Sequence, residues 1–109
     1  MKIDFNAIPE QMITALRGGE GELTAKMYES DWGKVMPCRL HPGSSIGPHC
    51  HETSDEICYV LYGNGIATCD GEEETLHIDA CHICKKGSTH SIVNTGMTDL
   101  VMLAVIVEK

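Results

Sequence analysis

The chain has 109 residues, which is the size of one modest domain and leaves no room for a second independent core. Hydrophobic residues make up 42% of it and charged residues 22%, a mixture typical of folded globular proteins and not of disordered or fibrous ones. The formal net charge of −8 repels phosphate backbones and anionic membrane surfaces, so we expect no nucleic acid and no membrane among its partners.

The chain start and the longest apolar run indicate a cytoplasmic protein. The opening MKIDFNAIPE lacks the apolar core and the cleavage site of a secretory signal. Residues 100–107 form the longest apolar run, which is far shorter than the about 20 residues that a membrane-spanning helix needs. Because the cytoplasm keeps thiols reduced, we expect the six cysteines to be mostly free thiols and not a disulfide framework.

The predicted elements are strands, apart from one short helix near the N-terminus. Four apolar residues at spacings of three or four favour a helix near residues 9–16, so residues 1–22 are interpreted as an N-terminal arm or short helix. After that, 11 glycines and 4 prolines divide the chain into apolar stretches of strand length. We expect strands at residues 23–28, 34–41, 56–62, 66–69, 75–78, 81–84, 90–93 and 100–107.

Two features of the second half have structural consequences. Asp70-Gly71 separates two expected strands and favours an antiparallel hairpin, because Gly tolerates the positive φ that tight turns need. The three glutamates at 72–74 that follow are expected to be a solvated loop. The strand at 100–107 is apolar at every position, which predicts burial on both faces, inside a sandwich or at a subunit contact.

The most informative pattern is a pair of histidines followed by a glutamate. His49 and His51 are two residues apart, so in a strand they lie on one face with Cys50 turned away. Imidazole and carboxylate suit first-row divalent metals, and Glu56 on the adjacent strand would complete a set of three ligands. The alternative is that these are surface residues near a loop, surrounded by solvated charge.

The spacing around these residues resembles the first motif of the cupin superfamily, which is Gly, five residues, His-x-His, three or four residues, Glu, six residues, Gly. The matching residues are Gly43, His49, His51, Glu56 and Gly63. The second cupin motif is Gly, five residues, Pro-x-Gly, two residues, His, three residues, Asn. Gly87, His90 and Asn94 match it, whereas Asp79 and Lys85 stand where its first Gly and its Pro are usual.

The resemblance implies an all-β fold, a small double-stranded β-helix or jelly-roll barrel, with residues 1–109 as a single cupin domain. Its motifs lie at about 43–63 and about 79–94. It implies one divalent transition metal, Fe, Mn, Ni, Zn or Co, held by His49, His51, Glu56 and His90. Small single-barrel cupins commonly pair, so it also implies a homodimer, for which the apolar strand at 100–107 is suited.

Four further residues are candidates for the pocket. Regular alternation from Glu56 would place Cys58 and Tyr62 on the inward face of their strand. Arg39 on the preceding strand would meet an acidic substrate if it points inward, although exposed Arg is the commoner case. His82 would approach the pocket from the strand at 81–84. That strand also carries a Cys-x-x-Cys pair, which we interpret as buried, inert thiols because strand positions three apart face opposite sides.

The expected function is that of a mononuclear divalent-metal enzyme acting on a small oxygenated or anionic molecule, of the isomerase, lyase or dioxygenase type. Three neutral imidazoles and one carboxylate around a divalent cation leave a charge of about +1 and two open octahedral positions, which favours anionic oxygen ligands. The metal would act as a Lewis acid, lower the pKa of a bound water or, if iron, bind dioxygen. The alternatives are a non-catalytic module that binds or senses a small ligand in the same pocket, and a metal-free barrel.

Overall fold

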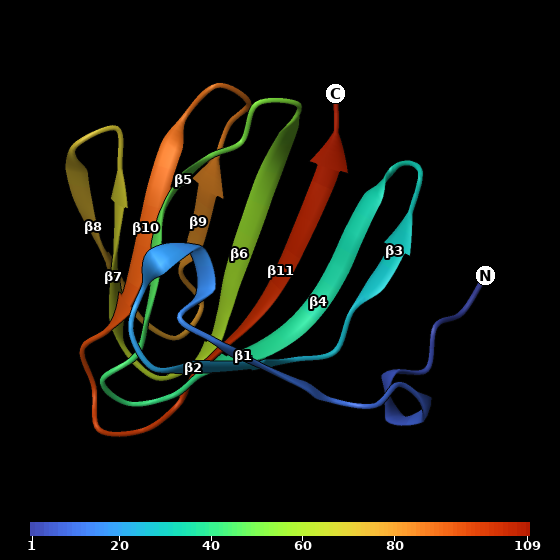
Figure 1. Cartoon of the computed structure of the whole chain (residues 1–109), viewed down its shortest axis with the longest axis horizontal. Coiled ribbons are helices and arrows are strands. Elements are labelled where there is room, and N and C mark those ends of the chain that lie inside the picture. The colour runs from blue at the N-terminus through green and yellow to red at the C-terminus, as the bar shows by residue number, and fades with distance from the viewer.

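The structure, a computed structural model, describes residues 1–109 and consists almost entirely of strands (Figure 1). None of its helical segments is long and apolar enough to cross a bilayer. In chain order the elements are η1 (Phe5–Ala7), β1 (Gln11–Thr14), η2 (Leu16–Gly18), β2 (Glu22–Ala25), β3 (Tyr28–Ser30), β4 (Gly33–Leu40), β5 (Ser45–Cys50), β6 (Ser54–Tyr62), β7 (Gly65–Cys69), β8 (Glu72–Leu76), β9 (Cys81–Cys84), β10 (Thr89–Asn94) and β11 (Leu100–Glu108).

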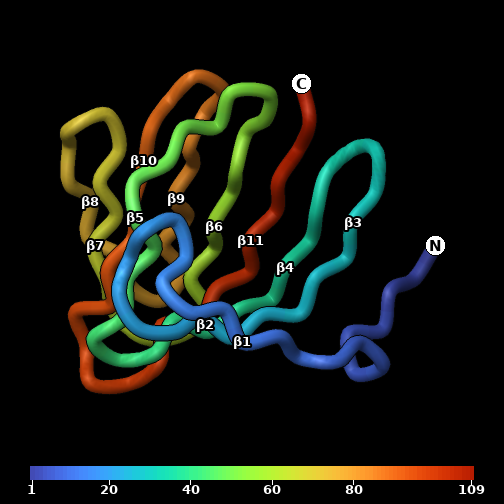
Figure 2. Tube along the Cα trace, viewed as in Figure 1, coloured from blue at the N-terminus to red at the C-terminus, as the bar shows by residue number.

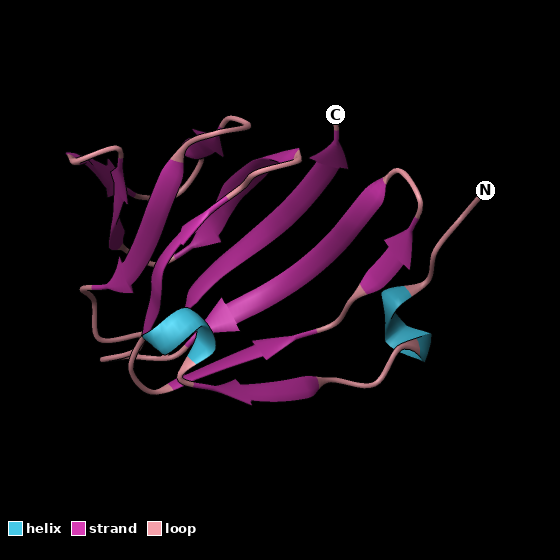
Figure 3. Cartoon of the chain, turned by 45° about the horizontal axis from the view of Figure 1, so that its top comes forward, coloured by secondary structure: helices cyan, strands magenta, loops and turns pink.

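Two antiparallel sheets form the barrel. The large sheet has the order β1-β2-β4-β11-β6-β9, with β3 also paired to β4, and the small sheet has the order β5-β10-β7-β8. The tube in Figure 2 shows β4 and β11 side by side although they are far apart in the sequence. Figure 3 shows how little of the chain is helical: one short turn, η1, precedes β1, and the other, η2, lies between β1 and β2. The predicted all-β, double-stranded β-helix fold is confirmed.

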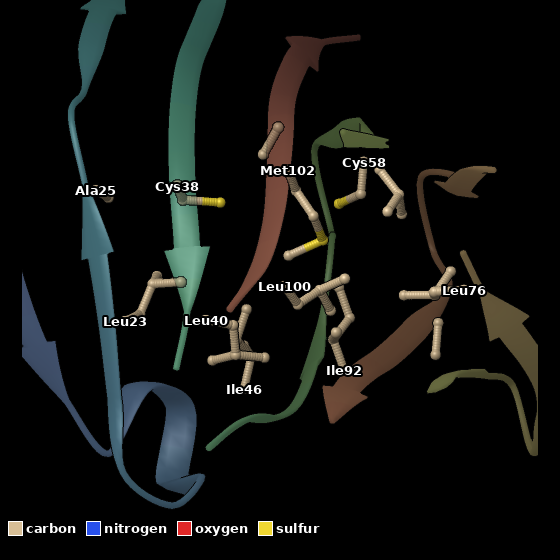
Figure 4. Packing of buried hydrophobic residues seen from close by; sticks show 13 residues of the cluster. Leu23, Ala25, Cys38, Leu40, Ile46, Cys58, Leu76, Ile92, Leu100 and Met102 are labelled. Carbon is tan, nitrogen blue, oxygen red and sulfur yellow. The ribbon is translucent and has the colours of Figure 1, made fainter. Parts of the chain in front are cut away.

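The interior between the sheets is filled by a cluster of 13 buried hydrophobic residues (Figure 4). The large sheet contributes Leu40, Val60 and Met102, and the small sheet contributes Ala67 and Ile92, none of them more than 2% exposed. Burying a large aliphatic side chain stabilises a fold by about 1.5–3 kcal/mol. This core therefore holds the two sheets together and fixes the positions of the polar residues that share the barrel interior.

The apolar strand β11 lies in the middle of the large sheet, between β4 and β6. Its inward residues Leu100, Met102 and Ala104 are 0%, 1% and 4% exposed, whereas the residues between them remain half-buried. The strand therefore buries one face within a single chain, and the predicted burial of both faces is not seen there. Its outer face stays available for a contact with another molecule.

The predicted helix near residues 9–16 is wrong. Gln11–Thr14 form β1, which pairs antiparallel with β2 along the edge of the large sheet. Tertiary hydrogen bonding to β2 here outweighs a weak helical spacing of apolar residues. The strand expected at 23–28 is likewise interrupted at residues 26–27, so that it becomes β2 and β3, while the other expected strands agree with β4 and β6 to β11 within three residues at either end.

The hairpin at Asp70-Gly71 is confirmed. Both residues have positive φ, 49° and 84°, as a tight two-residue hairpin turn requires, and β7 pairs antiparallel with β8. Because the turn is so short, β8 begins at Glu72, so the glutamates at 72–74 belong to a strand and not to the expected loop. Glu74 is the register partner of Ala67 on β7.

Candidate metal centre

Three strands bring the four predicted ligands to one place in the barrel interior. His49 is near the end of β5 and His51 follows that strand directly, so both rings lie on the same side while Cys50 is exposed. His90 on β10 is the register partner of His49, and Glu56 on β6 arrives after the short connection from β5. The ligating atoms of all four side chains lie within 4.8 Å of one another.

The distances within this cluster match those of ligands around one cation. Nε2 of His90 lies 3.1 Å from Nε2 of His49, 3.0 Å from Nε2 of His51 and 2.9 Å from Oε1 of Glu56. Neighbouring ligands of an octahedral ion with bonds of about 2.1 Å are about 3.0 Å apart. The side chains are therefore spaced so that a single ion can contact each of them.

The backbone fixes which ring nitrogen of His49 faces the centre. Nδ1 of His49 lies 2.8 Å from the carbonyl oxygen of Gly47, which only accepts hydrogen bonds, so the proton is on Nδ1 and the Nε2 lone pair faces the other ligands. His51 is held on its outer side by Ser54, with 3.4 Å between Nδ1 and the hydroxyl oxygen. In the metal-free protein the close contacts among His51, His90 and Glu56 are hydrogen bonds that need shared protons, and a bound cation would take the place of those protons.

Burial and neighbouring charges set the ionisation of the ligands. Burial by itself raises the pKa of Glu56, but the adjoining rings of His51 and His90 outweigh it and bring the pKa down to about 2, so the carboxylate is ionised near neutral pH. Burial also lowers the pKa of His49, which keeps its imidazole neutral. Neutral imidazole and ionised carboxylate are the forms that bind metal.

The four residues border a cavity of about 150 Å³. Pockets for drug-sized ligands measure roughly 300–1,000 Å³, so this space suits a much smaller molecule. Most of its wall is apolar, but two cationic residues also line it, Arg17 from η2 and Lys34 from the start of β4. Neither was among the candidates from the sequence, although Lys34 alternates with the inward-facing Met36 and Cys38 and that period could have revealed it.

A strained loop brings Arg17 to the cavity. Ala15 and Arg17 have φ values of 52° and 56°, a left-handed conformation that costs of order 1 kcal/mol or more for residues other than glycine. The loop packs so closely against β5 that a Cβ added to Gly47 would lie 2.1 Å from the carbonyl oxygen of Arg17. Only glycine allows this approach, and nothing in the local sequence around Arg17 predicts it.

Three of the four additional pocket candidates do not line the cavity. Cys58 lines it and is 2% exposed, and burial raises the pKa of its thiol well above the ordinary value, so it is a neutral wall residue. Tyr62 is 54% exposed, because β6 gains one residue relative to β11 near its end and the regular alternation stops there. Arg39 points away from the interior and pairs with Glu10 at 2.8 Å and with Asp99 at 3.7 Å.

The fourth candidate, His82, does not border the cavity but contacts the cluster from behind. It is buried on β9, and its Nε2 lies 2.9 Å from Nδ1 of His90. Within the same strand the two thiols of the Cys-x-x-Cys pair lie on opposite faces as expected, with Cys84 fully buried. The expected burial of Cys81 is wrong, because its side of β9 faces outward and the thiol is exposed. His41 is engaged elsewhere, with its ring between Thr24 and Asp99.

The two departures from the second motif are accommodated by the backbone. Asp79, which stands where glycine is usual, adopts a left-handed φ of 69°, and short polar Asp is one of the few other residues that tolerate it. Asn94 is buried and ties three backbone groups together, since its amide donates to the carbonyls of Leu40 and Thr98 and its oxygen accepts from the N–H of Gly96. The motif therefore keeps its structural role in this chain.

Comparisons with known proteins agree with this architecture. A curated "Oxalate-binding protein" of Thermotoga maritima is 34% identical over 113 residues, which cover 98% of this chain and 93% of that protein. A crystal structure described as "a predicted oxalate decarboxylase" from Thermotoga maritima has a TM-score of 0.93 at 34% identity and full coverage of both chains. The cupin domain of Schizosaccharomyces pombe Cnp3 shares the fold alone, with a TM-score of 0.81 at 13% identity, covering 100% of this chain and 74% of that one.

The family itself is identified by a match along most of the barrel. The family model described as "Cupin domain" matches residues 37–106, which include all four clustered side chains and both motifs. This match spans more than half of the chain, and it agrees with the full-length similarity to the Thermotoga maritima relative. The chain therefore belongs to the cupin family.

Proposed function

We propose that this protein holds one divalent transition metal through His49, His51, Glu56 and His90 and uses it to bind a small dianionic molecule, such as a dicarboxylate. The observation that carries the proposal is the convergence of four ligating atoms within 4.8 Å on side chains of which three are buried, with Nε2 of His49 unprotonated and turned toward the others. When bound, the metal supplies a Lewis-acidic centre for oxygen ligands. Fe, Mn, Ni, Zn and Co all accept such a set of ligands.

The charges around the cavity support an anionic ligand. A divalent metal, Arg17 and Lys34 outweigh the single carboxylate of Glu56, so the cavity attracts anions although the whole chain carries a charge of −8. All four ligands border the same cavity, so a metal that they held would be accessible from it. A small dicarboxylate could bind such a metal through its oxygens and present its remaining charge to the cationic side chains.

The named relatives point to the same class of ligand. The Thermotoga maritima protein that matches this chain along almost its whole length is named for oxalate binding. Oxalate is a planar dianion of the size that a cavity of about 150 Å³ suits. We also propose a cytoplasmic location, in keeping with six cysteines that are all free thiols in the structure.

We expect oxalate to bind the metal-loaded protein and not the metal-free protein. Isothermal titration of oxalate, malonate and acetate into both forms, with the metal content measured beside them, tests this. Oxalate will bind more tightly than acetate, because two oxygens on one metal cooperate. An Arg17→Met variant will bind oxalate about tenfold more weakly or worse, since a hydrogen bond to a charged group contributes about 1.5–3 kcal/mol.

The matched control is Arg39→Met, because Arg39 is a half-exposed arginine that pairs with Glu10 outside the cavity. Its oxalate affinity will equal that of the wild type. Equal oxalate binding with and without metal would contradict the proposal, and so would binding that Arg17→Met and Arg39→Met weaken to the same degree.

The second candidate function is a metal-dependent enzyme of the isomerase, lyase or dioxygenase type, which the cavity-facing metal positions favour. The only other titratable side chains on the cavity wall are Arg17, Lys34 and the two thiols of Cys38 and Cys58, and burial raises the pKa of Cys38 to about 12. The cavity wall therefore offers few side chains that could act as a general acid or base toward a substrate, which favours ligand binding over catalysis. Incubation of the metal-loaded protein with oxalate, sugar phosphates and diketones, with dioxygen consumption followed, separates the two: unchanged oxalate indicates a binding protein.

We further propose a homodimer that pairs through the outer face of the large sheet. Tyr59, Leu61 and Ile83 are 37%, 50% and 50% exposed on that face. The outward side chains of β11, including Leu103, are only half-buried and lie next to Tyr59 in the register. Adjacent apolar side chains of this kind mark a protein–protein contact when they form one continuous patch.

We expect a Leu103→Glu variant to be monomeric where the wild type is dimeric at micromolar concentration. A charge at the centre of an apolar interface would lie buried without a partner, which costs several kcal/mol. Light scattering coupled to size exclusion measures the mass directly. Val93→Glu, on the exposed outer face of the small sheet, is the matched control and will remain a dimer. A wild-type mass equal to one chain would refute the proposed pairing.

A further inference from the structure

A chain of side-chain contacts leads from the solvent to the back of one metal-binding histidine. Glu74 on β8 is exposed, and its Oε1 lies 2.6 Å from Nδ1 of His82 on β9. Nε2 of His82 lies 2.9 Å from Nδ1 of His90 on β10, and the two rings are stacked with their centroids 5.1 Å apart. The side chain of His82 is 0% exposed, so these two contacts account for both of its polar atoms.

These contacts specify the position of each proton once the metal is bound. To bind a metal, Nε2 of His90 must be unprotonated, so its proton lies on Nδ1 and is donated to Nε2 of His82. His82 then carries its own proton on Nδ1 and donates it to Glu74, whose carboxylate accepts. Every donor faces an acceptor along this path, and reversing any one ring would place two donors or two acceptors against each other.

We infer that Glu74 and His82 are positioning residues that fix the ring orientation and the tautomer of His90 for metal binding. This inference rests on the metal site proposed above. A carboxylate–histidine pair behind a ligating histidine orients its ring and makes it a better ligand, and losing such a partner typically costs 10–100-fold in metal affinity. His90 is also the ligand whose Nε2 contacts all three of the others, so its orientation governs the whole cluster.

The other two ligating histidines are held differently. His49 donates to the backbone carbonyl of Gly47, which any sequence can supply, and His51 has only a 3.4 Å contact with Ser54. His90 alone depends on a pair of side chains, and these come from two other strands that belong to different sheets. The neighbouring β8, β9 and β10 are seen together at one side of the barrel in Figure 1. Mutation of Glu74 will thus affect the metal site from outside the cavity.

The acidic segment of β8 provides a matched pair of variants. Glu74 is opposite Ala67, which faces the interior, whereas Glu73 is opposite Thr68 and lies on the other side of the strand. Both glutamates are exposed, so substitutions at either are compatible with folding. His82 is fully buried and its substitution can impair folding, so the test relies on Glu74.

The experiment compares Zn²⁺ affinity of the full chain, measured by competition with a chelator, in the wild type, Glu74→Ala, Glu74→Gln and Glu73→Ala. We expect about tenfold or greater weakening in Glu74→Ala and a smaller loss in Glu74→Gln, whose amide oxygen can still accept from His82. Glu73→Ala will bind Zn²⁺ like the wild type. Thermal melting of the metal-free proteins will show the wild-type melting temperature for Glu73→Ala and a lower one for the still folded Glu74→Ala, because Nδ1 of the buried His82 loses its partner.

Ring nitrogen NMR gives a second measurement that a purely structural role would not change. In long-range ¹H–¹⁵N spectra of the Zn²⁺-loaded wild type, we expect protons on Nδ1 of both His82 and His90. A proton on Nε2 of His82, or Glu74→Ala binding Zn²⁺ as tightly as the wild type, would overturn the inference while leaving the metal site intact. A wild type that binds no divalent metal would instead refute the proposed function.

Discussion

A His51→Ala variant will bind divalent metal at least about 100-fold more weakly than the wild type. Removing a ligand exceeds the loss of an outer partner, which by itself costs 10–100-fold. In this chain we expect a larger loss, because Nε2 of His51 lies within 3.1 Å of both Glu56 and His90. Removing the ring leaves these two residues with one ligand fewer with which to hold a shared cation. Metal analysis of protein purified without oxygen and without chelators will show a strongly reduced stoichiometry.

The control for that experiment is His77→Ala, which removes an exposed histidine outside the cluster. It changes the charge and composition of the chain in the same way and will retain the wild-type metal content. If His51→Ala and His77→Ala contained the same amount of metal as the wild type, the assignment of ligands would be wrong. Any metal that remains in His51→Ala would be bound elsewhere, by the exposed thiols or by other sites on the surface.

A Leu100→Ala variant will lower the free energy of unfolding by about 2–5 kcal/mol, the usual cost of removing a large aliphatic side chain from a rigid core. Leu100 is 0% exposed and begins the central strand of the large sheet. Two glycines pack against it, Gly63 against its backbone and Gly65 against its side chain, so little can move into the space that the substitution leaves. Urea unfolding of the metal-free protein measures the loss, which corresponds to a fall in Tm of roughly 10 °C or more.

Met97→Ala is the matched control, because Met97 is 96% exposed and its loss will leave stability within about 0.5 kcal/mol of the wild type. Leu100 and the His/Glu cluster are at opposite ends of β11, since Glu56 pairs with Ile106 near the other end of that strand. Folded Leu100→Ala protein will therefore bind metal as the wild type does. A stability loss below about 1 kcal/mol would show that the barrel interior is less tightly packed than the structure indicates.

Local sequence patterns predicted part of the His/Glu cluster because strand geometry repeats every two residues. His49 and His51 must share a face of any regular strand, and Asp70-Gly71 can supply the positive φ values of a tight turn in any surroundings. The second motif added His90, and the structure brings that residue beside the other three. These inferences needed only short-range spacing and the resemblance to a family pattern.

Predictions failed where a residue's neighbours come from distant parts of the chain. The helix expected near residues 9–16 became β1 because β2 offered a free edge. Tyr62 turned outward because one extra residue in β6, relative to β11, broke the alternation on which its placement depended. The acidic residues 72–74 became a strand because the hairpin turn before them is only two residues long.

By itself, the sequence determined the mostly β class and the hairpin, through strand-length apolar stretches and the conformational freedom of a turn, and its resemblance to the cupin motifs pointed to the four clustered residues. Only the tertiary structure decided that Arg17 and Lys34 line the cavity and that Glu74 reaches His90 through His82. The physical reason is that pairing between strands distant in the sequence places these groups together. Such pairing is set by burial of the whole core, which no short stretch of sequence contains.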